Sequence, residues 1–249
     1  MRKSIFLAGF VLTALLFGAC NKKDIFPTVK LENIMQLQVG KYIIYKLDSL
    51  NYVNFNRTLA ITKYQAKDVV DAAITDNLGR PSWRVIRYLR DSASTSEADW
   101  KQNITYMITI LPNSVQVVEE NQRYIKLMQP LRESFTWRGN AYINPESFDA
   151  SFSIDDWDYT YANVYSPFVF DDARTIDSTI TVNQREEVLG DTSNPAGYSV
   201  QNFSKEVYGH NIGLIYKELF HSEYQPGDGS LTESYYFGYG IRLRMIDHN

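Results

Sequence analysis

The amino-acid sequence predicts an all-β domain in which a meander of antiparallel strands curls into a barrel or half-barrel. Aromatic residues make up 14% of the 249 residues, and 18 of them are tyrosines. Flat rings pack well on the half-buried surface of a β-sheet. Short β-rich runs are separated by turns rich in Gly, Asn, Asp and Pro. These observations favour strands joined by tight turns over a helical class.

Six β-rich runs make up the first half of the chain. The clearest covers residues 104–110, where every second side chain is apolar, as expected for a strand that buries one face. Residues 76–79 (Asp-Asn-Leu-Gly) and 120–121 (Glu-Asn) have the composition of hairpin turns. The six runs are residues 41–47, 58–75, 83–90, 104–110, 115–119 and 124–128.

The second half contains four further runs, at residues 159–170, 176–182, 212–220 and 235–246. In the last run Leu243 faces one side of the strand, and Arg242 and Arg244 face the other. The connection before this half holds the one short helix that we expect, starting at Asn144-Pro145. Roughly ten strands would leave unpaired sheet edges, and closure removes them. A lipocalin-like barrel or strongly curled half-barrel is therefore preferred to a two-sheet sandwich.

The N-terminal segment predicts export and a lipid anchor. Residues 1–19 have the pattern of a signal peptide, with Arg2 and Lys3 before an apolar run too short to span a bilayer. Residues 17–20 (Phe-Gly-Ala-Cys) resemble the bacterial lipobox, in which the cysteine is lipidated and becomes the new N-terminus. Cys20 is the one cysteine of the chain, so it has no disulfide partner. An ordinary cleaved signal peptide is the alternative.

A tether and one domain are expected to follow the anchor. Residues 20–39 form the lipidated N-terminus and a flexible tether, because they are polar and lack periodicity, and a single β domain occupies residues 40–249. Several acyl chains on Cys20 would hold the protein on a membrane without a spanning helix. Asn21 after the cysteine resembles the sorting pattern for delivery to the outer membrane of the cell envelope. The leaflet stays open.

Four segments of the chain share a pattern with a known group of proteins. They are residues 40–49 (GKYIIYKLDS), 137–140 (WRGN), 213–218 (GLIYKE) and 247–249 (DHN). Together they resemble an uncharacterised group of lipoproteins from Bacteroidota, and the resemblance covers most of the chain after Cys20. Ile43 departs from that group, in which Trp is expected. The resemblance implies an outer-membrane lipoprotein with a β domain, and it implies no activity.

The residue pattern argues against several functions. Loss of Arg2 and Lys3 with the signal peptide changes the formal net charge from −4 to −6, and an acidic domain is a poor partner for nucleic acid. The sequence contains no nucleophile elbow, phosphate-binding loop, zinc-protease motif or dinucleotide fingerprint. The three histidines are too widely spaced for a local metal motif, and the acidic run around Trp157 lacks calcium-loop spacing. We therefore expect no catalytic residue, metal or cofactor.

Four aromatic residues form the candidate binding surface: Trp157, Tyr159, Tyr161 and Tyr165. They share strand parity, so in a regular strand they line one face together. Packing in the core is the alternative role for these rings.

Three functional hypotheses remain. The first is a non-catalytic lipoprotein that binds an apolar or amphipathic small molecule in its β-barrel. The second is an interaction or structural subunit of the envelope, with another envelope protein as its partner, or a glycan-binding surface lipoprotein. The third is a hydrolase with a pair of carboxylates that are distant in the sequence. Binding is preferred to catalysis.

Overall fold

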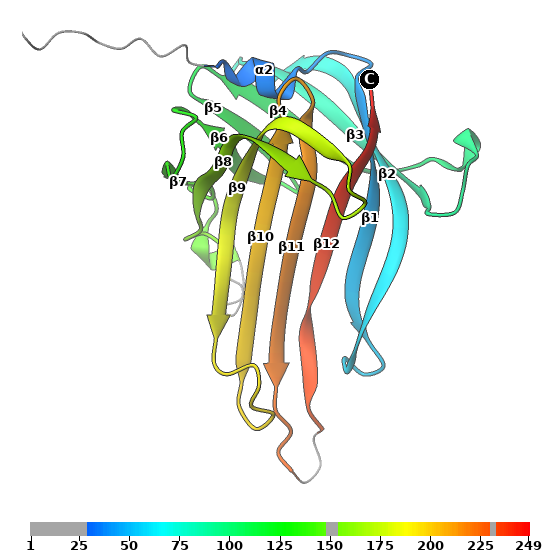
Figure 1. Cartoon of the computed structure of the whole chain (residues 1–249), viewed down its shortest axis with the longest axis vertical. Coiled ribbons are helices and arrows are strands. Elements are labelled where there is room, and N and C mark those ends of the chain that lie inside the picture. Colours follow the sequence, from blue (N-terminus) through cyan, green and yellow to red (C-terminus); the bar gives the residue numbers. More distant parts are fainter. Residues whose placement is uncertain (1–28, 148–153, 230–232) are drawn as a thin grey trace, which may run out of the picture.

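The protein is an all-β barrel, as predicted. The computed structural model describes residues 29–147, 154–229 and 233–249. Their strands form one antiparallel sheet that curls into a nearly closed barrel (Figure 1). The strands are β1 (Tyr42–Val53), β2 (Thr58–Thr75), β3 (Pro81–Asp91), β4 (Lys101–Leu111), β5 (Ser114–Glu119), β6 (Gln122–Met128), β7 (Thr136–Arg138), β8 (Asp158–Val169), β9 (Thr175–Leu189), β10 (Ser199–Gly209), β11 (Gly213–Gln225) and β12 (Tyr235–His248).

The strand order is a double meander around a central pair. It runs β6-β5-β4-β3-β2-β1-β12-β11-β10-β9-β8-β7, so each half of the chain forms its own run of hairpins. The two halves join where β1 pairs with β12, from Ile43 opposite His248 to Asn51 opposite Tyr239. The two edge strands, β6 and β7, are consecutive in the chain. A short connection therefore brings both edges together, which removes most of the exposed sheet edge.

Few bonds close the barrel between these edges. The backbone N–H of Ile125 donates to the carbonyl of Gly139 at 2.7 Å. The indole N–H of Trp137 donates to the carbonyl of Ile125 at 2.8 Å. The hydroxyl of Tyr161 accepts from the N–H of Met128 and donates to its carbonyl. Side chains thus satisfy backbone groups that a full strand ladder would otherwise pair.

The barrel wall is much shorter on one side than on the other. β5, β6 and β7 have 6, 7 and 3 residues, whereas β9 to β12 have 11 to 15. In Figure 1 the long strands β10, β11, β12, β1 and β2 extend below the level of the short ones. The lower part of the sheet is therefore an open, one-sided extension of the barrel wall.

A short helix covers the upper end of the barrel. Helix α2 (Leu31–Met35) buries Leu31, Ile34 and Met35 in the main hydrophobic core (Figure 1). The prediction of a flexible tether up to residue 39 is therefore wrong for this segment. Its three apolar side chains have a partner surface that only the assembled barrel provides. Cys20 and the signal peptide lie outside the described residues.

The structure differs from the sequence prediction in one short helix and in two additional strands. A single turn of 3-10 helix at Pro145–Ser147 occupies the place predicted for the short helix, and Asn144 caps it by accepting from the N–H of Glu146 at 3.1 Å. A second such turn is at Glu97–Asp99. Two strands were not predicted: β7 lies within the predicted connection, and β10 follows the loop after residue 190.

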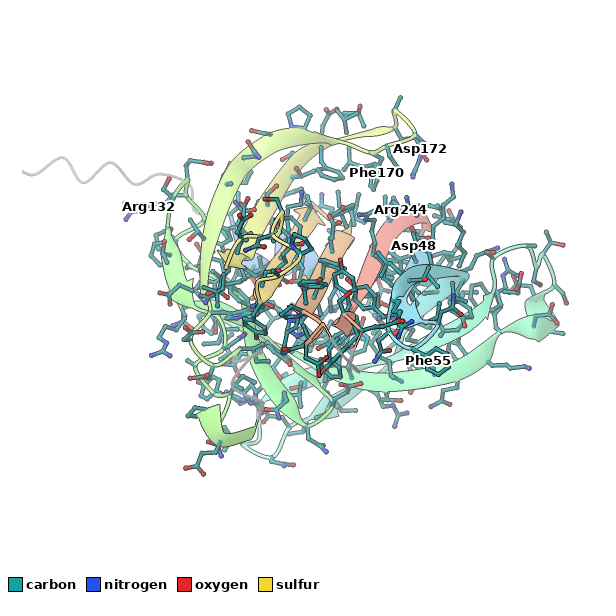
Figure 2. All side chains as sticks on the ribbon, turned by 90° about the horizontal axis from the view of Figure 1, so that it is seen from below. Asp48, Phe55, Arg132, Phe170, Asp172 and Arg244 are labelled. Carbon is teal, nitrogen blue, oxygen red and sulfur yellow. The ribbon has the colours of Figure 1, made fainter. Side chains whose placement is uncertain are left out.

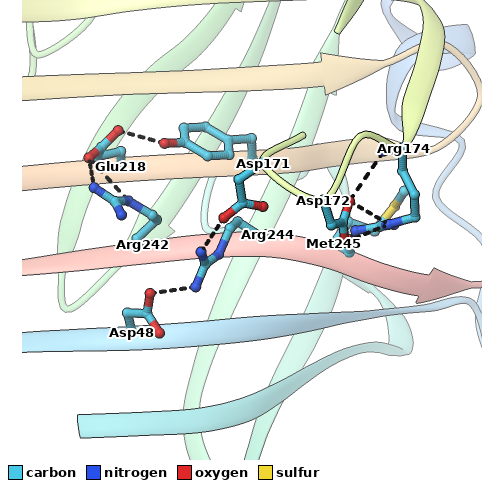
Figure 3. Close-up of polar contacts among 9 residues, drawn as sticks. Asp48, Asp171, Asp172, Arg174, Glu218, Arg242, Arg244 and Met245 are labelled. Atoms are coloured by element: carbon cyan, nitrogen blue, oxygen red, sulfur yellow. Dashed lines mark hydrogen bonds and ion pairs between the residues drawn. The ribbon is translucent and has the colours of Figure 1, made fainter. Parts of the chain in front are cut away.

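The β8–β9 hairpin folds back across the outer face of the barrel. In Figure 1 it crosses in front of β10 and β11, and its tip lies near β12. Phe170 at the tip is buried, and Asp171 pairs with Arg244 at 2.6 Å. The guanidinium of Arg174 donates to the carbonyl of Met245 at 2.8 Å. Figure 3 draws the bonds of Asp171 and Arg174, and Figure 2 shows Phe170 and Arg244 on the same side of the molecule. These contacts confirm that Arg244 faces outward, while Leu243 is buried.

The packing of helix α2 makes a prediction about stability. Replacing Ile34, which is fully buried, by Ala should lower the free energy of unfolding by about 2–5 kcal/mol, because a cavity is left against the barrel core. Urea unfolding measures the change. The matched control is Asn33→Ala on the exposed face of the same helix, expected within about 0.5 kcal/mol of wild type. Equal effects of the two variants would contradict this placement of the helix.

Candidate functional site

The middle of the barrel interior is polar and carries charge. The ammonium group of Lys126 on β6 lies 2.8 Å from a carboxylate oxygen of Glu206 on β10. These two strands are not neighbours in the sheet, so the ion pair spans the lumen. Tyr208 donates its hydroxyl to the other oxygen of Glu206 at 2.7 Å. Buried charges are tolerated when they are paired and hydrogen-bonded in this way.

The pKa values of this pair follow from burial and mutual attraction. Burial alone would raise the pKa of Glu206, but the attraction of Lys126 and Lys217 holds it below its ordinary value. Burial alone would lower the pKa of Lys126, and the charge of Glu206 raises it above its ordinary value. Both groups are therefore charged at neutral pH.

A second buried ion pair and a small cavity lie towards the helix-covered end. Arg87 and Asp68 are 2.6 Å apart, and Tyr106 donates to the carboxylate of Asp68 at 2.9 Å. Asp68 and Tyr106 border a cavity of about 60 Å³ below helix α2. Met35 of the helix is part of the cavity wall. The upper lumen is thus largely filled by side chains.

A larger cavity occupies the lower lumen. It encloses about 360 Å³ and combines aromatic, apolar and charged walls. The lining residues are Glu119, Glu120, Gln122, Tyr124, Lys126, Asn140, Ile154, Trp157, Tyr159, Gln184, Ser204, Lys217, Leu219 and Tyr239. Its size falls within the range of small-molecule sites, about 300–1,000 Å³.

The cavity and helix α2 lie at opposite ends of β6. Gln122, at the start of this strand, lines the cavity, whereas Met128, at its end, does not. The residue after Met128, Gln129, donates its side-chain amide to the carbonyl of Val29 at 2.8 Å, next to the helix. The cavity is therefore on the side of the barrel away from the helix.

Polar groups of the cavity are arranged in pairs. Lys217 lies 3.9 Å from Glu119, and this ammonium group lowers the pKa of Glu119. A catalytic general acid needs the opposite shift. Ser204 donates its hydroxyl to the side-chain oxygen of Gln184 at 2.6 Å. The amide nitrogen of Gln184 has no hydrogen-bond partner in the described structure, although this side chain is only 3% exposed.

Two of the predicted binding residues line this cavity. Trp157 and Tyr159 are part of its wall, and both are almost fully buried. The hydroxyl of Tyr159 donates to the side-chain oxygen of Asn140 at 2.7 Å. Its ring lies edge-on to Trp137, with 5.8 Å between ring centroids. These rings therefore combine core packing with a surface that borders the cavity.

The other two predicted residues lie elsewhere. Tyr161 packs against Trp137, with ring centroids 4.4 Å apart, and its hydroxyl closes the barrel at Met128. Tyr165 is 43% exposed and does not line the cavity. β8 is not the regular strand on which the prediction of one shared face depends. Asn163 and Tyr165 have positive φ angles of 52° and 59°, and the pairing register shifts between Ala162 and Ser166.

The sequence analysis did not identify several residues that line the cavity. Gln184 and Ser204 come from β9 and β10, Lys217 from β11 and Tyr239 from β12, so they meet only after the barrel closes. A signal was present in β10, where polar residues alternate with Phe203 and Val207. A strand with polar residues at every second position is commonly half-exposed, which is why this signal does not indicate a lumen.

From the buried Lys126–Glu206 pair we predict how the free energy of unfolding depends on pH. Lys126→Met should lower the free energy of unfolding at pH 7 by about 3–5 kcal/mol, because Glu206 is left as an unpaired buried charge. In the wild type the pKa of Glu206 is lowered, so its contribution is present above pH 4.5 and is lost as the pH falls.

In the Lys126→Met variant the pH dependence of stability should have the opposite sign. Without Lys126 the buried carboxyl has a raised pKa, so stability is lost as the pH rises above 4.5. The destabilisation by Lys126→Met should therefore be smaller at pH 4.5 than at pH 7 in urea titrations. The double variant Lys126→Met/Glu206→Leu, which removes both charges, should recover most of the loss. A penalty that is independent of pH would contradict this account of the pair.

The described residues hold no metal-binding cluster and no membrane-spanning helix. Within residues 29–147, 154–229 and 233–249, no three His, Cys, Asp or Glu side chains are grouped so that they could hold a metal ion. No helix in these ranges is long and apolar enough to cross a membrane. No protein-family model matches the chain, and no curated protein matches its sequence.

Proposed function

We propose that this protein is an exported, lipid-anchored binding protein that holds a small amphipathic molecule in the lower cavity of its barrel. The observation that carries the proposal is the cavity itself. It has the volume of a ligand site and a wall in which Trp157, Tyr159 and Leu219 alternate with paired polar groups. Apolar surface supplies binding energy, and the few polar groups fix orientation.

The polar groups of the cavity wall favour an amphipathic ligand over a purely apolar one. A pure hydrocarbon would cover Lys126, Lys217 and Glu119 without offering them hydrogen bonds. Covering charged groups whose hydrogen-bonding capacity is only partly satisfied costs free energy. A molecule with both apolar faces and hydrogen-bonding groups avoids this cost.

Sequence features support the envelope location. The basic and apolar start, the lipobox-like residues 17–20 and the resemblance to Bacteroidota lipoproteins agree on a lipid at Cys20 and on the outer membrane. Val29 is next to helix α2, which covers the end of the barrel away from the cavity. A protein anchored through its N-terminal segment would thus carry the cavity on its far side.

The binding proposal predicts a co-purifying ligand. Native mass spectrometry on the full chain, in lipid nanodiscs, should detect an added small mass. Tyr239→Ala should reduce its occupancy, because this ring lines the cavity. The matched control is Tyr165→Ala, since Tyr165 and Tyr239 are 43% and 42% exposed but only Tyr239 borders the cavity. Equal occupancy in the two variants would place the ligand elsewhere, and an apo mass after growth in several media would contradict binding.

The anchor proposal predicts a change in fractionation. Cys20→Ala should leave an unprocessed signal peptide, so the variant should carry no acyl chains and should stay in the inner-membrane fraction instead of reaching the outer membrane. Mass spectrometry of the N-terminal peptide should show acyl chains on Cys20 in the wild type only. A wild-type protein that is soluble, with a free thiol at Cys20, would refute the anchor.

A further inference from the structure

Three aromatic side chains form a row on β12 below the barrel. Tyr235, Phe237 and Tyr239 are 38%, 57% and 42% exposed. β12 pairs with β11 without a register shift from Tyr235 to Arg244, so these rings lie on the same face as Leu243, which is fully buried in the barrel. We call these three residues the aromatic row. It continues the lumen-facing surface beyond the closed part of the barrel.

The row is exposed because the wall that would face it is too short. β5 ends and β6 begins at the cavity, through Glu119 and Gln122, and the short β5, β6 and β7 do not extend down to the lower part of β12 (Figure 1). Tyr239 is both the upper end of the row and part of the cavity wall. His221 on β11 contacts Phe237 and Tyr239, with ring centroids 6.5 and 6.2 Å apart. The row and the cavity are thus one continuous surface.

The local sequence keeps the rings in line. Gly238 and Gly240 alternate with the rings and point to the other face of the strand. Gly238 has a φ of +153°, and a Cβ there would collide with the backbone carbonyl of His221. A Cβ at Gly240 would press on the carbonyl of Leu219 at 3.0 Å. The glycines let β12 lie close against β11 without a register shift, so the three rings stay on one face.

The charges at the cavity disfavour an anionic ligand. Glu119 and Glu120 line the cavity together with Lys126 and Lys217, and Glu206 is bonded to Lys126 behind the wall. These carboxylates outnumber the ammonium groups by one, so a fatty acid or a phosphate would gain no net attraction. A neutral ligand meets no such penalty.

The cavity wall also contains a buried donor without a partner. The amide nitrogen of Gln184 lacks an acceptor in the described structure, and this side chain forms part of the wall. A buried donor without a partner costs about 1–3 kcal/mol. A ligand oxygen would relieve this cost if the amide turned its nitrogen towards the cavity, with the Ser204 hydroxyl still donating to the amide oxygen. The cavity thus favours a ligand that carries hydroxyl or ether oxygens.

Resting on the binding function proposed above, we propose that the ligand is a neutral oligosaccharide, whose end unit occupies the cavity and whose following units stack along the aromatic row. Sugar rings present apolar C–H faces that pack on aromatic rings, and their hydroxyls both donate and accept hydrogen bonds. Both properties match this surface: flat rings lie on the open row, and the cavity wall holds paired polar groups and the unsatisfied amide nitrogen of Gln184.

Chain-length dependence tests the proposal. Calorimetry on the full chain in nanodiscs would use neutral gluco- and xylo-oligosaccharides of two, four and six units, with laurate as the anionic amphiphile. Affinity should rise with chain length, since longer chains reach Phe237. Phe237→Ala should lower the affinity for the hexasaccharide about five- to tenfold and leave the disaccharide unchanged. Gln184→Met should weaken all lengths alike.

The control is Leu78→Ala. Leu78 is 72% exposed in the turn that follows β2, whereas the row lies beside the β1–β2 hairpin at the other end of that strand, so this variant should bind every probe as the wild type does. Binding of laurate but of no sugar would overturn the oligosaccharide proposal and leave the binding function standing. Sugar binding without length dependence would overturn the role of the row. Binding of no probe, together with an apo mass in native mass spectrometry, would refute both.

Discussion

The ion pair between Lys126 and Glu206 is the constraint around which the barrel interior is arranged. It joins two strands that are not neighbours, and it is too deeply buried for water to compensate either charge. Tyr208 must therefore donate to the carboxylate, and Lys217 must remain nearby. Above the pair the lumen is filled by side chains, and below it the lumen is open. The pair is thus the boundary between a core and a site.

Unequal strand lengths turn this boundary into an accessible surface. A barrel with walls of one height would enclose the cavity, whereas the short β5, β6 and β7 leave the lower face of β11 and β12 open. The aromatic residues of that face remain exposed as a consequence. The binding energy available to a ligand then comes from two regions, a polar cavity and an open row of rings, which suits an elongated molecule better than a compact one.

The upper part of the molecule is secured by segments outside the barrel wall. Helix α2 covers one end with Leu31 and Ile34, and the β8–β9 hairpin lies across the outer face through Phe170 and Arg174. Both segments bury apolar surface and satisfy polar groups at the barrel. Stability is therefore concentrated away from the cavity, and the site itself can retain unpaired groups such as the amide of Gln184.

The sequence by itself determined the all-β class, most of the hairpins and the inward and outward sides of the last strand, because alternation and turn preference are local properties. It also pointed to Trp157 and Tyr159, although the irregularity of β8 before Tyr165 left no mark in the spacing. Only the tertiary structure decided that the polar residues of β10 face a lumen. The same alternation describes a half-exposed strand, and closure of the sheet is what separates the two cases.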